Sequence, residues 1–130
     1  MTHDEHLKFW LNSAEDDLES AIDVQKSGRY NWSLFIGHLA LEKILKALYV
    51  QATVNSVPPK IHNLLKLAEL SNTELSQEQQ EFFAEVNRFH FAGRYPDFKE
   101  DFKKIATPEF TSEYLSKIKD YFKWLKSLFK

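Results

Sequence analysis

Residues 31–53 read NWSLFIGHLALEKILKALYVQAT, in which apolar side chains occur on nearly every face of a helix. Asn31 suits the N-cap position, because its side-chain oxygen can accept a hydrogen bond from a free backbone N–H at a helix start. A helix that is apolar almost all round is usually buried on every side. The stretch therefore predicts the central helix of a helical bundle.

The few polar residues of this helix lie close together. His38, Glu42 and Lys46 recur every four residues and share one face, and Lys43 lies about 60° beyond Lys46. One interpretation is a polar seam that holds a phosphate or nucleotide, with the lysines supplying positive charge. The other is a Glu–Lys pair on a solvated edge of the helix, worth only about 0.2–0.5 kcal/mol.

Further amphipathic segments surround this helix in the sequence. Gly28 suits the C-cap of the first segment, Pro58 and Pro59 break the chain, and Ser76 with Gln79 resembles a capping box. The segments cover about residues 4–26, 62–70, 76–89 and 111–128. Together they predict an all-α fold, a compact antiparallel up-and-down bundle of four to five helices, in one domain over residues 1–130.

The composition excludes several classes of protein. The 130 residues include no cysteine, which rules out disulfides and thiolate zinc sites, and the formal net charge of -2 excludes nucleic-acid binding through overall charge alone. The N-terminus lacks the basic start and apolar stretch of a signal peptide, and no run is apolar enough to span a membrane. We therefore expect a cytoplasmic protein that does not associate with membranes.

Residues 91–108 read as a long irregular connection, and long loops often carry function. Within it, Arg94 offers planar donors suited to phosphate, and Tyr95 could stack on a base. Gly93 would let the chain bend sharply. The alternative is a capping turn, with Asp97 holding the next segment and Arg94 in a structural ion pair.

Histidines are the remaining candidates for chemistry. His62 could contact a ligand or act as a base, or it could simply cap the helix that follows. The five histidines, at positions 3, 6, 38, 62 and 90, form no i, i+4 pair and have no cysteine partners, so their spacing predicts no metal site. No phosphate-binding glycine loop or nucleophile motif is present, and we expect no cofactor.

The order of these blocks resembles that of the HEPN family, the higher eukaryotes and prokaryotes nucleotide-binding domain. The blocks are AEDDL at residues 14–18, HLALEKILKAL at 38–48, HNL at 62–64 and AGRYPD at 92–97. The resemblance covers nearly the whole chain. It implies a helical bundle that usually forms a homodimer, often works with a minimal nucleotidyltransferase, and behaves as part of a toxin–antitoxin module.

The resemblance also favours the nucleotide-binding interpretation of the polar stripe. If the long connection packs across the central helix, cationic and aromatic side chains converge in one cleft that suits a nucleotide phosphate. The predicted nucleotide-binding residues are Lys43, Lys46, His62, Arg94 and Tyr95.

Many HEPN proteins are metal-independent ribonucleases with an Arg, four to six residues, and then a His. No arginine and histidine of this chain have that spacing, since Arg29 and His38 are separated by eight residues and Arg88 and His90 by one. Two alternatives stay open. One is an RNA-cleaving toxin that uses Arg88, His90 and Arg94 across a dimer. The other is a non-catalytic dimerisation or adaptor domain, in which the polar stripe would be exposed to solvent.

Overall fold

The computed structural model describes residues 1–130, and all of its regular elements are helices. These are α1 (His3–Lys26), α2 (Tyr30–Ala52), α3 (Leu64–Leu70), α4 (Gln77–Arg94), α5 (Pro96–Ile105) and α6 (Pro108–Lys126). The predicted all-α bundle is confirmed, with six helices instead of four to five. No helix combines the length and hydropathy that a membrane span requires.

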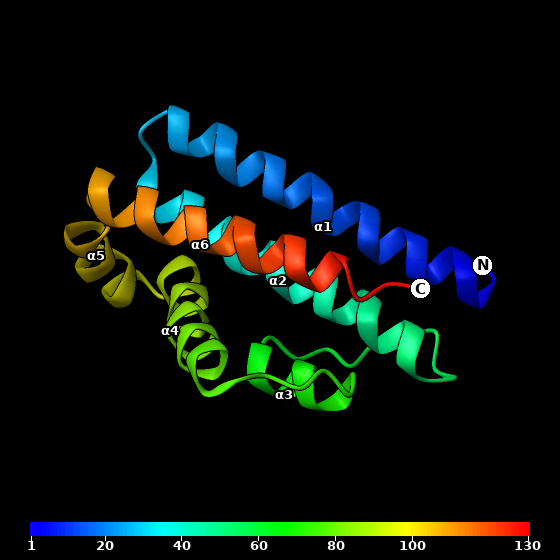
Figure 1. Ribbon diagram of the computed structural model, residues 1–130. Coiled ribbons are helices and arrows are strands. Elements are labelled where there is room, and N and C mark those ends of the chain that lie inside the picture. The colour runs from blue at the N-terminus through cyan, green and yellow to red at the C-terminus, as the bar shows by residue number, and fades with distance from the viewer.

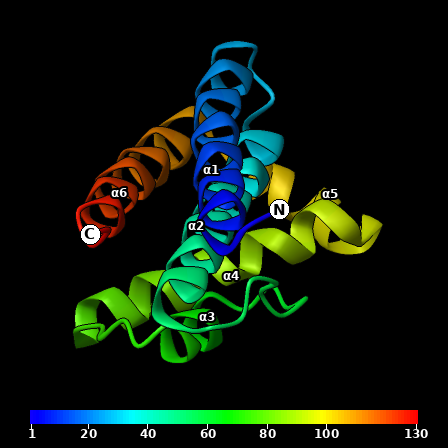
Figure 2. The same cartoon turned by 90° about the vertical axis from the view of Figure 1, so that its right-hand side faces the viewer.

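Helix α2 lies at the centre of the bundle. Helices α1 and α6 run along it, α1 in the opposite direction and α6 in the same direction (Figure 1). Helices α3 and α4 pack against another side of α2, and α5 lies beside its N-terminal part (Figure 2). The residues of α2 are buried on nearly all faces, which confirms the prediction of a central helix. Polar residues of α2 are therefore held inside the protein.

The helix boundaries follow local signals, with two exceptions. Ser27 is the C-cap residue of α1, and Gly28, predicted for that position, follows it with a φ of 84°. Ser76 and Gln79 form the predicted capping box of α4. Asn31 is not an N-cap, because α2 begins one residue earlier, after Arg29. His62 does not cap α3, because the side chain of Asn63 accepts the backbone N–H groups of Leu65 and Lys66.

The prediction of a long connection over residues 91–108 is wrong. Helix α4 continues to Arg94, Tyr95 is extended, and Pro96 is the first residue of α5. Proline lacks an N–H and has a fixed φ, so it fits the first position of a helix as well as it breaks the interior of one. Asp97 consequently lies within α5 and makes no capping contact.

Gly93 allows α4 to pack closely on α2, and it does not produce the predicted sharp bend in the chain. It lies inside α4, and a Cβ added there would stand 2.1 Å from a ring carbon of Phe35 on α2. Only glycine lets the end of α4 come this close to α2 without moving that ring. The contact fixes the C-terminal end of α4, and the residues it carries, against the central helix.

Candidate functional site

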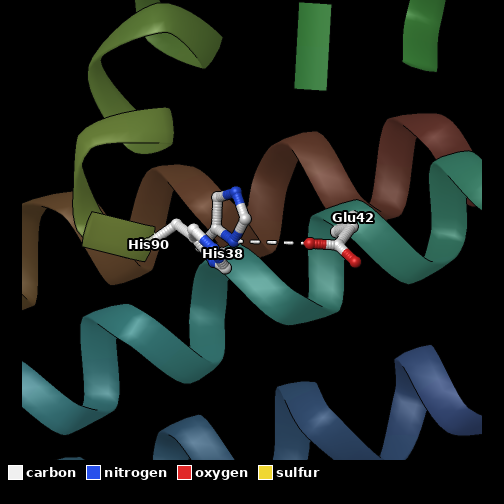
Figure 3. Close-up of side chains that lie close together, drawn as sticks. All are labelled: His38, Glu42 and His90. Carbon is white, nitrogen blue, oxygen red and sulfur yellow. Dashed lines mark ion pairs between the residues drawn. The ribbon is translucent and has the colours of Figure 1, made fainter. Parts of the chain in front are cut away.

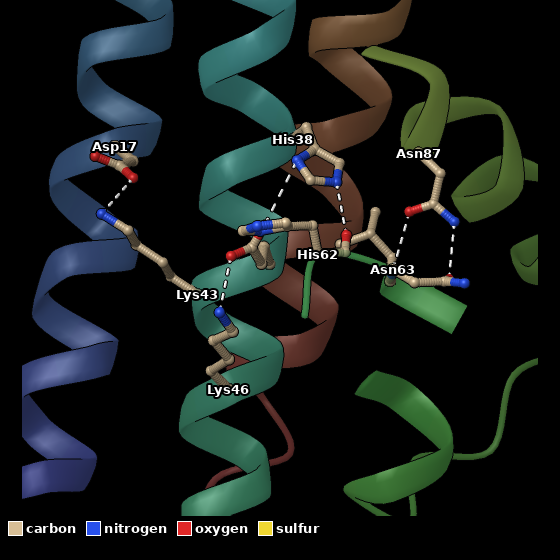
Figure 4. Close-up of polar contacts among 9 residues, drawn as sticks. Asp17, His38, Lys43, Lys46, His62, Asn63 and Asn87 are labelled. Atoms are coloured by element: carbon tan, nitrogen blue, oxygen red, sulfur yellow. Dashed lines mark hydrogen bonds and ion pairs between the residues drawn. The ribbon is translucent and has the colours of Figure 1, made fainter. Parts of the chain in front are cut away.

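The polar stripe of α2 is buried. His38 is 0% exposed, Glu42 4% and Lys46 5%, so the interpretation as a solvated edge is wrong. Buried charges are costly unless they are paired. The neighbours of these side chains lie on α1, on α2 itself, in the segment before α3 and on α4. Figure 4 shows these neighbours on two sides of α2.

On the side that faces α1, the lysines are neutralised. The Lys43 ammonium lies 2.8 Å from Oδ2 of Asp17 and donates to the Ser13 hydroxyl at 2.9 Å. The Lys46 ammonium donates to Oε2 of Glu42 at 2.9 Å and lies 5.5 Å from the centre of the Trp10 ring. Both positive charges are thus balanced by carboxylates of the protein itself.

On the other side, Glu42 and His38 hold the segment that precedes α3. Nδ1 of His62 lies 3.0 Å from Oε1 of Glu42, and Nε2 of His38 lies 3.0 Å from the backbone oxygen of His62. A carbonyl oxygen only accepts, so Nε2 of His38 carries the hydrogen. Burial lowers the pKa of His38 to about 4, against the attraction of Glu42. The imidazole is therefore neutral near pH 7, and Nδ1 is a bare lone pair.

That lone pair has no hydrogen-bond partner. Nδ1 of His38 is buried and unpaired, and it lies 3.9 Å from Oε1 of Glu42 (Figure 3). This separation is too long for a hydrogen bond, and a neutral ring makes no ion pair. Two atoms that both accept therefore face each other inside the bundle.

His90 on α4 completes a cluster of three histidines. Its ring centre lies 4.3 Å from that of His62 and 5.2 Å from that of His38. Its Nδ1 is also buried without a partner. Burial, with His62 and Arg94 adding to the effect, lowers the pKa of His90. One donor atom from each of His38, Glu42 and His90 lies within 4.8 Å of the others, a set that could hold a metal ion.

Local spacing could not reveal this cluster. The sequence predicts no metal site because no two histidines are four residues apart. The three clustered histidines lie on α2, before α3 and on α4, and only the fold brings them together. No sequence signal pointed to Asn87, which holds these elements together. Its Oδ1 accepts the Leu64 N–H at 2.9 Å, and its Nδ2 donates to Oδ1 of Asn63 at 3.0 Å (Figure 4).

A small pocket opens beside the histidines. It has a volume of about 140 Å³ and is lined by His62, Asn63, Asn87, His90 and Phe91. The His62 side chain is 45% exposed, and its Nε2 has no protein partner. Solvent and ligands can therefore reach one edge of an otherwise buried cluster.

Arg94 and Tyr95 lie near this edge, at the end of α4. Arg94 is exposed, takes part in no ion pair, and influences the pKa of His90 one helical turn away. Tyr95 is 52% exposed and packs with Phe91 and Phe98, with ring centres 6.1 and 6.4 Å away. Arg88 lies on the same helix, 3.7 Å from Glu85.

The structure thus divides the five predicted nucleotide-binding residues. His62, Arg94 and Tyr95 lie toward α4, whereas Lys43 and Lys46 are paired with carboxylates. Arg94 makes no structural ion pair, which was the alternative to a role in phosphate binding.

Comparison with known proteins identifies one family. The family model for the HEPN domain matches residues 7–128. No curated protein and no solved structure matches the chain.

Proposed function

The chain belongs to the HEPN domain family, and we propose that it binds a nucleotide or an RNA end on the face formed by His62, Arg94 and Tyr95. The observation that carries this proposal is that Arg94 is exposed and has no carboxylate partner, beside exposed aromatic rings and a pocket lined mostly by polar residues. Guanidinium groups bind phosphate through paired N–H donors, and aromatic rings stack on bases of any sequence.

The lysines are left out of this binding face. Lys46 is 5% exposed and donates to Glu42, and Lys43 is held by Asp17. A phosphate would have to displace these carboxylates before it could reach the ammonium groups. We therefore assign Lys43 and Lys46 to the packing of α1 on α2.

Binding of a fluorescently labelled oligoribonucleotide, followed by anisotropy, tests the proposal. Arg94→Gln should weaken binding by about tenfold or more, because a charge-assisted hydrogen bond contributes about 1.5–3 kcal/mol. Tyr95→Ala should have a similar effect, since stacking of one base contributes about 1–3 kcal/mol.

Lys119→Gln is the matched control. It removes the same unit of positive charge from an exposed position on α6. Equal losses in Arg94→Gln and Lys119→Gln would show that only overall charge matters, and the proposed face would be wrong.

A second candidate, metal-independent RNA cleavage, is favoured by the stacked imidazoles. Buried Glu42 orients His62 through Nδ1, and His90 is held neutral beside it. One histidine could then take the proton of a 2′-hydroxyl while the other gives a proton to the leaving oxygen, with Arg94 near the phosphate charge. Incubation of a mixed RNA pool with wild type and with His62→Ala distinguishes cleavage from binding alone.

For the assembly, we propose a homodimer that acts with a minimal nucleotidyltransferase in a toxin–antitoxin-like module. Family membership supports the partner, and the exposed apolar side chains of α4 and α5 support a protein interface. These side chains are Phe91, Phe98 and Ile105. Phe98→Glu should convert a dimer to a monomer in sedimentation experiments, and a wild-type monomer would refute the dimer.

A further inference from the structure

The unpaired nitrogen atoms inside the bundle are positioned to bind a positively charged ion. His38 Nδ1 is fully buried and faces Oε1 of Glu42 at 3.9 Å, with no donor between them. A buried polar atom without a hydrogen-bond partner destabilises the folded protein. Nδ1 of His90 has the same defect in the same cluster. A bound cation would satisfy acceptor atoms that no protein donor reaches.

We propose that His38, Glu42 and His90 bind a divalent transition-metal ion of the zinc type. Their donor atoms all lie within 4.8 Å of one another, and ligands about 2.0–2.2 Å from one zinc ion stand somewhat closer than that. Small side-chain movements on α2 and α4 would therefore close the site. Two imidazoles and one carboxylate favour zinc and its neighbours over magnesium or calcium, which take oxygen ligands.

The surroundings of His38 resemble those of a metal-binding histidine. Its Nε2–H donates to the backbone oxygen of His62, which fixes the tautomer and directs Nδ1 toward Glu42. Metal-binding histidines usually donate their second N–H to a carbonyl or carboxylate in this way. Three protein ligands leave a fourth position for water, as in zinc sites that are not purely structural.

Glu42 can serve this site without losing its present partners. A carboxylate offers about four lone-pair positions, and Glu42 receives only the donors of Lys46 and His62. Lys46 nevertheless opposes the ion, because its ammonium is bound to the same carboxylate. The site should therefore bind metal more tightly when this charge is removed.

The proposal is tested by titrating Co²⁺ into protein that carries no histidine tag and has been treated with a chelator. Wild type should take up one equivalent and develop a visible absorption band of low-coordinate Co²⁺, and Zn²⁺ should abolish it. His90→Phe keeps a ring against His62 and Phe35 but removes the nitrogens, so the band should disappear. His6→Ala is the matched control for a histidine of α1 and should retain the band.

Two further variants keep the test independent of folding defects. His38→Gln should also lose the band, and circular dichroism shows whether each variant is folded. Lys46→Met should bind Co²⁺ about tenfold more tightly, because removing one positive charge near the ion relieves repulsion. Absence of the band in wild type, or its persistence in folded His90→Phe, would overturn the proposal. Neither result bears on the oligoribonucleotide face around Arg94, which is measured without metal.

Discussion

Buried polar groups on the two sides of α2 differ in whether the protein supplies partners for them. Toward α1, the ammonium groups of Lys43 and Lys46 each lie within 3 Å of a carboxylate oxygen. Toward α4, His38 and His90 each keep a buried nitrogen without a partner. The charges toward α1 are neutralised in ion pairs, as a packing interface requires, although Oδ2 of Asp17 accepts no hydrogen bond. Unsatisfied imidazole nitrogens beside a pocket are instead typical of sites that bind something. We therefore propose the α4 side as the one that binds a ligand.

Glu42 joins the two sides, so its removal should have the largest effect. Glu42→Leu leaves the Lys46 ammonium buried without a partner and frees His62. We expect a loss of about 3–5 kcal/mol in the free energy of unfolding, measured with urea. The double variant Glu42→Leu/Lys46→Met removes both charges and should recover much of this loss. A double variant as unstable as the single one would contradict the assignment of Lys46 to a packing role.

Acid should destabilise the α4 side. The pKa of His38 is lowered by burial from 6.5 to about 4, with Glu42 opposing the shift and His90 and His62 adding to it. The unfolded chain therefore binds more protons than the folded one between these values, and stability falls as pH falls through that window. The contribution of His38 is a loss of about 2 kcal/mol between pH 7 and pH 5.

Urea unfolding at both pH values, with a chelator present, measures this dependence. His38→Gln should show a clearly smaller loss, with the remainder coming from groups such as His90, whose pKa is also lowered. An equal pH dependence in wild type and His38→Gln would show that His38 is not held neutral by the fold.

Gly93→Ala should push α4 away from α2 and so destabilise only the α4 side of the central helix. Its Cβ would lie 2.1 Å from the Phe35 ring, and overpacking of this kind costs about 1–3 kcal/mol. Gly37→Ala is a milder control, because the nearest atom to its Cβ would be the terminal methyl of Ile118 at 3.0 Å, and the next, on Leu115, lies at an ordinary contact distance of 3.6 Å. Thermal unfolding should show a larger decrease in Tm for Gly93→Ala, and the reverse order would contradict the packing argument.

The Lys43–Asp17 ion pair should contribute least. Both side chains are about a quarter exposed, and the contact is an ion pair in which Oδ2 accepts no well-aligned hydrogen bond. Such pairs contribute about 0–1 kcal/mol. Asp17→Asn should therefore change the free energy of unfolding by no more than about 1 kcal/mol. A larger loss, measured with urea, would mean that the α1 side depends on this charge more than its exposure suggests.

The sequence predicts the helices more completely than it predicts the residues of the site. The apolar pattern of α2 and the capping signals of Ser76 and Gly28 are local, and the structure agrees with them. Helix α5 was missed because Pro96 looks the same in sequence whether it breaks a helix or begins one. The stripe of α2 was recognised, but its burial depends on how α3 and α4 pack against it.

The convergence of His38, His62 and His90 also could not be predicted from local sequence patterns, because it depends on how the helices pack. The residues are 24 and 28 positions apart in sequence. The close approach of α4 to α2 at Gly93 brings His90 to His38, and contacts with His38 and Glu42 hold the segment that carries His62. His90 was a catalytic candidate in the sequence, together with Arg88, but nothing there connected it to His38 or Glu42.

The most direct test compares the two sides of α2 in a single assay. Oligoribonucleotide affinity, measured by fluorescence anisotropy, should fall about tenfold or more in Arg94→Gln and change by less than about twofold in Lys43→Gln. Loss of affinity in Lys43→Gln with none in Arg94→Gln would place the binding face toward α1 and contradict the account.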